Sequence, residues 1–236
     1  MIERSHGGDR TDRASRVRAS ASAGHRRLAG LASLSIAIGL GCGLYQTPQL
    51  VNFSTSPRDY SGQDYPDVYE RWTRHAKVVH DVDSALEVWA TYKSIDFREA
   101  FVARYAEAYS LADEDRERLR SAQRDAAASD YEFLVQSQSA NYRWNDLEKK
   151  TSPWRVSLRD GRGSELVPDS VKVEKLPDMF ERVFYPAKTP FTKTYTVRFS
   201  RGAGDREGTF SGERTGLITL RFASPMGNAD LSWTEH

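Results

Sequence analysis

The second half of the chain consists largely of short runs in which apolar and polar residues alternate. Alternation with a period of two is typical of a strand with one buried face, because successive side chains of an extended chain point to opposite sides. Turns rich in glycine and proline separate several of these runs, at residues 160–163, 201–208 and 225–228. The pattern predicts six strands, over residues 131–138, 153–160, 169–176, 193–200, 216–224 and 229–234.

A seventh strand and two helices are predicted before this region. In residues 84–94 the apolar positions again alternate with polar ones, which indicates a strand. Over residues 95–109 aromatic side chains recur at every fourth position, at Phe97, Phe101, Tyr105 and Tyr109, and this spacing predicts an amphipathic helix. The next segment, up to about Ala127, has a weaker apolar face. Ser110, with Asp113 three positions later, resembles a capping box, and Asp113, Glu114 and Asp115 favour a helix N-terminus, so this segment predicts a second helix capped by Ser110.

A further helix is predicted at the start of the folded body. Pro66 suits the first turn of a helix, and Asp64 precedes it as a candidate N-cap. Apolar residues then follow at spacings of three and four, at Tyr69, Trp72, Ala76 and Val79. This spacing predicts a helix that continues to Val79.

These elements together predict an α+β fold. About seven strands at fairly regular spacing, linked by turns, indicate an antiparallel β-sandwich of the immunoglobulin-like kind. The two helices between residues 95 and 127 then form a helical hairpin inserted after the first strand. We expect a single globular domain over residues 64–236, with a helical part at 64–129 and the sandwich at 130–236.

The pattern changes near the N-terminus, where the run from Leu28 to Tyr45 contains no charged residue. Arginines stand directly before this run, and its apolar core is too short and too rich in small residues for a membrane-spanning helix. A positive segment followed by a short apolar core is typical of an export signal, which we expect over residues 1–41. Residues 42–63, rich in Ser, Thr, Pro and Gln, are expected to form a flexible tether to the folded body.

Charge and cysteine content exclude two classes of protein. Of the 34 basic and 33 acidic residues, seven arginines and three acidic residues lie in residues 1–41, so the rest of the chain has a net charge of −3. Nucleic-acid binding needs a concentrated basic face, so we expect no nucleic-acid partner. Cys42 is the single cysteine of the chain, so an internal disulfide framework is excluded.

The candidate catalytic and metal-binding patterns are weak. The densest group of metal-ligand residue types is His75, His80, Asp81 and Asp83. Its two histidines are five positions apart and would not share one face of a helix. Close glycines lie between predicted strands, without the helix N-terminus that a phosphate site needs. No motif of an activated nucleophile is present, so we expect no catalytic residues, no metal and no cofactor.

The tryptophans offer one candidate contact site. Trp154 and Trp233 lie in register with the apolar positions of their predicted strands, which indicates core packing. Trp144 instead lies between predicted strands, near Asn141 and Asp146. Because loops often carry binding residues and tryptophan is enriched at contact sites, Trp144 is the candidate for contact with a partner.

The sequence around Cys42 resembles the lipobox of bacterial lipoproteins. The stretch "GLGC", Gly39 to Cys42, places a small residue directly before the cysteine, although Gly39 stands where leucine is usual. In that family the cysteine thiol receives a diacylglycerol and becomes the new N-terminus after cleavage, so the resemblance implies lipidation of Cys42.

Most of the chain after the tether also resembles a group of uncharacterised bacterial envelope lipoproteins. The resemblance is carried by the stretches "YERWTR", "LEVWATYKSIDFREAFVARYAEAY", "RWNDLEKKTSPWRVSL" and "LSW". It implies a location in the cell envelope and a similar fold, and it implies no activity.

The expected function is that of a lipid-anchored outer-membrane protein that faces the periplasm or the cell surface. Gly43, rather than an aspartate, follows the cysteine, and this favours the outer membrane. The expected partners are the membrane, through the lipid anchor, and other envelope proteins or glycans, which the sandwich would bind or assemble without catalysis. One alternative is a hydrolase of cell-wall or surface polymers that uses two facing carboxylates. Another is a structural spacer that holds partners away from the membrane.

Overall fold

The computed structural model describes residues 49–54, 56–187, 189–202 and 210–236. All of these residues belong to one compact unit of the chain. The predicted export signal at 1–41, the lipidation site Cys42 and most of the predicted turn at 201–208 lie outside the described residues.

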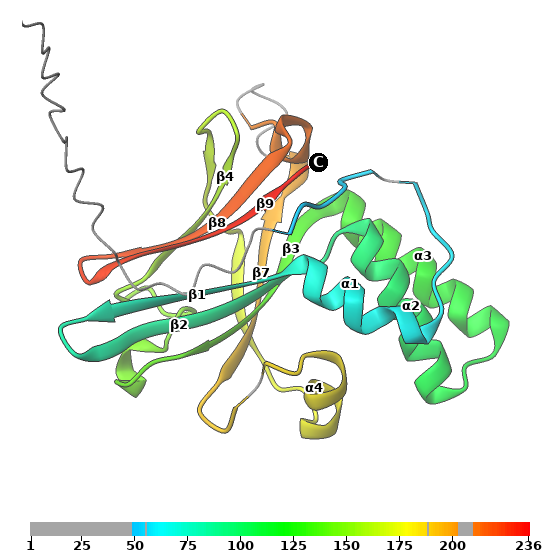
Figure 1. Cartoon of the computed structure of the whole chain (residues 1–236), viewed down its shortest axis with the longest axis horizontal. Coiled ribbons are helices and arrows are strands. Elements are labelled where there is room, and N and C mark those ends of the chain that lie inside the picture. The colour runs from blue at the N-terminus through cyan, green and yellow to red at the C-terminus, as the bar shows by residue number, and fades with distance from the viewer. Residues whose placement is uncertain (1–48, 55, 188, 203–209) are drawn as a thin grey trace, which may run out of the picture. The chain divides into compact units, whose positions relative to one another are not determined.

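The body is built from two antiparallel β-sheets and four α-helices (Figure 1), which confirms the predicted α+β class with a sandwich-like arrangement of strands. The larger sheet has the strand order β1-β2-β3-β7-β6, and the smaller sheet has the order β5-β4-β8-β9. The larger sheet is formed by β1 (Thr73–His80), β2 (Asp83–Tyr92), β3 (Asp130–Gln138), β7 (Lys193–Ser200) and β6 (Ser170–Glu174). The smaller sheet is formed by β5 (Glu165–Leu166), β4 (Arg155–Asp160), β8 (Leu217–Ser224) and β9 (Gly227–Thr234).

The main hydrophobic core lies between the two sheets. In β2 the alternating positions Leu86, Val88, Ala90 and Tyr92 are fully buried, as the sequence pattern predicts for one face of this strand. Trp233 of β9 meets the larger sheet here, with its ring centroid 5.3 Å from that of Phe133 and 6.0 Å from that of Tyr92. The predicted core positions of Trp154 and Trp233 are therefore confirmed, with exposures of 4% and 0%.

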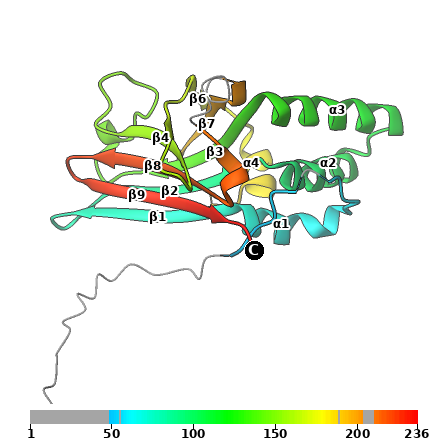
Figure 2. The same ribbon diagram turned by 90° about the horizontal axis from the view of Figure 1, so that it is seen from above.

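The helices gather on one side of the two sheets, and α2 and α3 extend away from them (Figure 2). They are α1 (Tyr65–Trp72), α2 (Ile95–Tyr109), α3 (Asp113–Ser129) and α4 (Asp178–Phe184). The predicted hairpin is confirmed as α2 and α3, which are inserted between the neighbouring strands β2 and β3. Neither α4 nor the short strand β5 was predicted from the alternation of residues.

The predicted continuation of the first helix to Val79 is wrong. Helix α1 ends at Trp72, and the next eight residues form β1, which pairs with β2 from Thr73 opposite Thr91 to His80 opposite Asp83. Ala76 and Val79 match the helical spacing only by coincidence. The backbone hydrogen bonds offered by β2 and the β-branched residues of this segment favour the strand.

The predicted capping role of Ser110 is also wrong. Ser110 ends α2 in the left-handed conformation, with φ of 50°, and its backbone N–H donates to the carbonyl groups of Ala106 and Glu107. Helix α3 begins after Ala112, which makes no side-chain cap. The left-handed residue reverses the chain direction so that α3 can return along α2.

Residues 49–54, which fall within the predicted tether, pack on the body. Val51 is 1% exposed and forms a parallel bridge with Glu235, while Phe53 packs on Trp72 with ring centroids 6.0 Å apart. The prediction of a tether is therefore wrong for residues 49–54 and for its end, where Tyr60 donates to Asp96 and a 3-10 helix begins at Gly62, and residues 42–48 lie outside the described residues. Within the described ranges, no helix combines the length and the apolar character needed to cross a membrane.

Candidate functional site

A cleft of about 260 Å³ lies on the outer face of the larger sheet, beneath the helices. One part of its lining is aromatic and aliphatic and includes Phe97, Phe101 and Phe180. The other part is charged and includes Glu132 and Arg198. An apolar enclosure with a few convergent polar groups is the usual character of a small-molecule site, so this cleft is the candidate functional site.

Strand alternation builds the charged floor of the cleft. In β3, Tyr131, Phe133 and Val135 face the core between the sheets, so Glu132 and Leu134 face the helices. Arg198 of β7 lies directly opposite Glu132 in the strand register, which places the two side chains on the same face. The backbone N–H of Lys93, just after β2, donates to the carbonyl oxygen of Glu132 and brings a second cation to this point.

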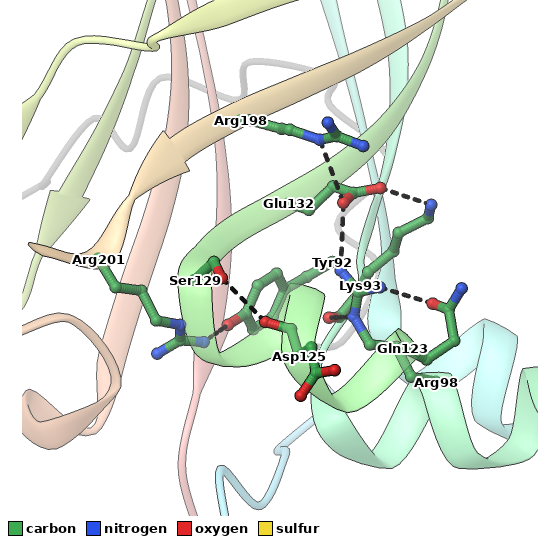
Figure 3. A network of polar contacts seen from close by, with 9 residues as sticks. All are labelled: Tyr92, Lys93, Arg98, Gln123, Asp125, Ser129, Glu132, Arg198 and Arg201. Atoms are coloured by element: carbon green, nitrogen blue, oxygen red, sulfur yellow. Dashed lines mark hydrogen bonds and ion pairs between the residues drawn. The ribbon is translucent and has the colours of Figure 1, made fainter. Parts of the chain in front are cut away.

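Glu132 is the centre of the charged group, as Figure 3 shows. Its side chain is 4% exposed, and Lys93 Nζ lies 2.6 Å from Oε1. Arg98 Nη2 and Arg198 Nε both donate to Oε2, each at 3.3 Å. Burial alone would raise the pKa of the Glu132 carboxyl, but the charges of the three cations together lower it to about 2. The carboxylate is therefore ionised at neutral pH, and both its oxygens accept hydrogen bonds.

Arg98 joins the helical hairpin to the sheet. Its side chain is 3% exposed, and its three nitrogens donate to three different elements of the structure. Nε donates to the carbonyl oxygen of Lys93 at 2.8 Å, Nη1 to Gln123 Oε1 of α3 at 2.6 Å, and Nη2 to Glu132. Arg98 is thus occupied by structural contacts.

Lys93 and Arg198 have donors left over. Arg198 uses only Nε on Glu132, its side chain is 45% exposed, and its two terminal nitrogens donate to no group among the residues that the structure describes. Lys93 is 18% exposed and uses one N–H on Glu132. Burial lowers the pKa of Lys93, although Glu132 opposes this change. These two side chains are the cations that can meet a ligand in the cleft.

The apolar wall is part of an aromatic cluster between α2 and α4. The ring centroid of Phe180 lies 4.6 Å from that of Phe184 and 6.5 Å from that of Phe101. Phe97 is 6.4 Å from Phe101 and is almost fully buried. Phe101 and Phe180 are only partly buried, so their rings form the surface that the cleft exposes.

The cleft is suited to binding and poorly suited to proton transfer. Glu132 is held ionised, so it lacks a proton to donate at neutral pH, and its lone pairs already accept from three cations. No group of three or more His, Cys, Asp or Glu side chains arranged for a metal occurs in the described part of the chain. The unused donors of Lys93 and Arg198 are suited to an anion.

The residues singled out in the sequence do not lie in this cleft. His75 of β1 stacks on Trp89 with ring centroids 4.7 Å apart and contacts Glu87 Oε1 at 3.1 Å. Trp144 lies in a 3-10 helix (Tyr142–Trp144) and packs partly buried against the core, whereas Tyr142 beside it is 75% exposed. The region around Trp144 and the cleft are separate places in the fold.

Sequence reasoning did not find Lys93, Glu132 or Arg198. Each is a charged residue in or beside a predicted strand, and such residues are most often solvated. The one available signal was that Glu132 lies between Tyr131 and Phe133 in a central, mostly apolar run. A charge at such a position implies a partner if a helix covers that face.

A second depression, of about 300 Å³, lies on the smaller sheet and is lined by Arg159, Asp160, Gly163, Thr219, Asp230 and Ser232. Its lining contains no large apolar side chain, and Asp160 is already used by backbone donors of Arg162, Ser164 and Ser211. It offers a ligand less apolar contact than the cleft above the larger sheet.

The structure defines the class of this protein as an α+β protein of two antiparallel sheets, with a cleft between the larger sheet and the helices. Comparison of the chain with protein-family models, with curated proteins and with solved structures found no match.

Proposed function

We propose that this protein is a lipid-anchored component of the bacterial cell envelope whose body is a binding module without catalytic activity. The observation that carries the binding role is the cleft beside Glu132. It combines an apolar wall with two cations that have unused donors, and its one deeply buried carboxylate is fully occupied. Such a site can hold a ligand but has no group poised for acid–base chemistry.

The proposed location rests on the N-terminal sequence. A positive segment, a short apolar run and the stretch Gly39 to Cys42 support export, lipidation of Cys42 and retention at the outer membrane. Two or more acyl chains hold a protein stably on a bilayer, whereas a single chain does not. In this proposal the partners are the membrane, through the lipid, and an envelope protein, glycan or small molecule bound by the body.

We also propose that the sandwich is immunoglobulin-like. Such sandwiches have strands in the order A-B-E-D in one sheet and place C beside F and G in the other. With β2 taken as strand A, the order β2-β3-β7-β6 corresponds to A-B-E-D, and β5-β4-β8-β9 corresponds to C′-C-F-G. The buried Trp154 directly before β4 also suits strand C of such a fold. In this assignment β1 is an added edge strand and the α2–α3 hairpin is an insertion between A and B.

Trp144 remains the proposed contact site for a larger partner. It lies in the connection between β3 and β4, beside the exposed ring of Tyr142, and Arg143 stands 5.8 Å from that ring. Aromatic and arginine side chains are enriched at protein contacts, which supports this proposal.

The hydrolase alternative lacks a comparable observation. Glu132 and Glu174 both line the cleft, but the strand register separates them by two strands and four positions, which puts their Cα atoms about 16 Å apart. The nucleophile or base of a glycosidase needs a free carboxylate oxygen, and its acid needs a proton. Glu132 has neither, because three cations hold it ionised and occupy both of its oxygens. The spacer alternative gives no role to the cleft.

The experiment that tests the location compares the full chain with Cys42→Ser in a Gram-negative host fed an alkyne-labelled fatty acid. We expect the wild-type chain to carry the label and to sediment with outer membranes. Cys42→Ser should lose the label and leave that fraction, whereas the neighbouring control Gly43→Ser should behave as wild type. Recovery of Cys42→Ser in the same membrane fraction with the same partners would contradict the proposal.

A further inference from the structure

We propose that the cleft binds a small organic anion, in which a carboxylate or phosphate head lies between Lys93 and Arg198 and a single ring or short chain packs on Phe101 and Phe180. This inference deepens the proposed binding role and rests on it. It names a ligand class for the cleft, and it does not depend on the lipid anchor.

The unused donors carry the first step. Arg198 presents both terminal nitrogens of its guanidinium group, and Lys93 keeps two of its three N–H donors, while each is held in place by Glu132 at one side. A guanidinium fork fits the two oxygens of a carboxylate or phosphate. Figure 3 shows the terminal nitrogens of Arg198 directed away from Glu132. The anion would therefore meet cations that the protein has already positioned.

The charge balance around the cleft favours an anion at this end. The cations that line the cleft are Lys93 and Arg198, and Arg98 contacts Glu132 beside them. The carboxylates that line it are Glu132 and Glu174, and Glu181 accepts a hydrogen bond from Thr194 near Glu174 in the strand register. At the Glu132 end of the cleft, three cations therefore surround one carboxylate.

The two carboxylates other than Glu132 do not stand beside the proposed anion. Glu174 pairs with Thr194, four positions before Arg198 on β7, which places it about 14 Å along the strands from Arg198. Glu181 bonds to the same residue, Thr194. Both groups therefore lie toward the other end of the strands, and Glu132 is neutralised by its three cations.

The volume of the cleft and its apolar wall limit the size and the chemistry of the rest of the ligand. A volume of about 260 Å³ is slightly below the range of about 300–1,000 Å³ that drug-sized ligands occupy. The ligand is therefore small, and its apolar part can contact the partly buried rings of Phe101 and Phe180. A free inorganic anion would leave this wall unused, so we expect it to bind more weakly than an anion with an apolar body.

The test measures binding to the full chain carrying Cys42→Ser, so that no acyl group competes for the cleft. The probes are 4-phenylbutyrate, its neutral counterpart 4-phenyl-1-butanol, and inorganic phosphate, each followed by titration calorimetry. We expect 4-phenylbutyrate to bind at least about tenfold more tightly than either of the other two probes. The proposal would be overturned if 4-phenyl-1-butanol or phosphate bound as tightly as 4-phenylbutyrate, or if no probe bound.

A pair of variants locates the site. Arg198→Gln should weaken the binding of 4-phenylbutyrate about tenfold or more, because it removes the charged fork. The control Arg221→Gln changes an arginine of the smaller sheet that pairs with Asp230, and it should bind as wild type does. Unchanged affinity in Arg198→Gln would place the ligand elsewhere and overturn the assignment.

If Arg198→Gln does not fold, the comparison of 4-phenylbutyrate with 4-phenyl-1-butanol on the wild-type cleft still tests the proposed ligand class. If the binding test fails while membrane retention still depends on Cys42, the proposed ligand class is refuted and the proposed location is not.

Discussion

At the scale of single residues, Glu132 shows how a charge can be stabilised away from water. Its side chain is 4% exposed, and its ion pairs with Lys93, Arg98 and Arg198 offset the cost of removing the carboxylate from water. Removing one member of a buried ionic group lowers the stability of the fold by more than the whole group adds to it. The reason is that the remaining buried charges no longer have an opposite charge beside them. A substitution of Glu132 should therefore change both the free energy of unfolding and its dependence on pH.

The first prediction concerns the loss of stability at acidic pH. Glu132 has a pKa of about 2 in the folded protein against 4.5 as its ordinary value, so its ionised form stabilises the fold above about pH 4.5. This stabilisation is lost as the pH falls from about 4.5 toward 2. With 1.36 kcal/mol for each pKa unit, the loss in the free energy of unfolding is at most about 3 kcal/mol.

Urea unfolding of the wild type and of Glu132→Gln over pH 2–7 checks this prediction. The difference between the two free energies of unfolding should be largest above pH 5 and should shrink below pH 3. Glu165→Gln, which removes a half-exposed carboxylate of the smaller sheet, is the matched control and should run parallel to the wild type. A constant difference between wild type and Glu132→Gln at all pH values would contradict the argument.

At the scale of elements, helix α3 is attached to the body mainly by polar contacts. Ala127 is its single buried residue, so the helix has little hydrophobic reason to stay in place. It is held instead by Arg120 and Arg124, whose Nε atoms lie 3.1 Å and 2.7 Å from the buried carboxylate of Glu99 in α2. The contact of Gln123 with Arg98 adds to this attachment.

The second prediction follows from this attachment. Glu99→Gln should lower the free energy of local opening of α3 by about 1–3 kcal/mol, because two arginines lose their charged partner. Hydrogen exchange measured by mass spectrometry should show faster exchange in residues 113–129, with the strands unchanged. Arg118→Gln removes the same kind of exposed pair, with Asp115, within α3 and should leave exchange as in the wild type. Equal protection of α3 in Glu99→Gln would show that other contacts hold the helix.

The elements also show where a sequence pattern is reliable. Helix α2 matches its predicted bounds, because its aromatic periodicity extends over 15 residues, and α3 ends within two residues of its prediction. Strand β1 was predicted as a helix because two apolar residues fell at helical spacing by coincidence. An edge strand takes its conformation from the strand beside it, and pairing with β2 cannot be read from β1 alone.

At the scale of the whole molecule, the two sheets are joined at the edge where β1 approaches β9. Arg74 of β1 donates from Nε to the carbonyl oxygen of Ser232 in β9 at 2.8 Å, and from Nη2 to that of Gln49 at 2.6 Å. Its Nη1 donates to the carbonyl groups of Arg71 and Thr73. Burial lowers the pKa of Arg74 to about 10, which leaves it charged at neutral pH.

The third prediction tests this junction. Arg74→Met should lower the free energy of unfolding by about 2–4 kcal/mol, because several partly buried carbonyl groups lose their donor. For a body of this size the midpoint of thermal unfolding should fall by roughly 5–15 °C. Arg155→Met, at an exposed position in β4, is the control and should change the midpoint little. A midpoint within 2 °C of the wild type in Arg74→Met would show that the junction is held by apolar packing alone.

The sequence by itself determined the α+β class, the helical hairpin, and most of the strands, because local periodicity records which face of each element is buried. It also carries the prediction of export and of lipidation at Cys42, which depends on local residue types alone. The tertiary structure alone decided that β1 is a strand, that residues 49–54 pack on the body, and that Lys93, Glu132 and Arg198 meet in one cleft. These features depend on partners distant in the chain, such as Glu235 for Val51 and Arg198 for Glu132, and a charge on a strand looks solvated until a helix is known to cover it.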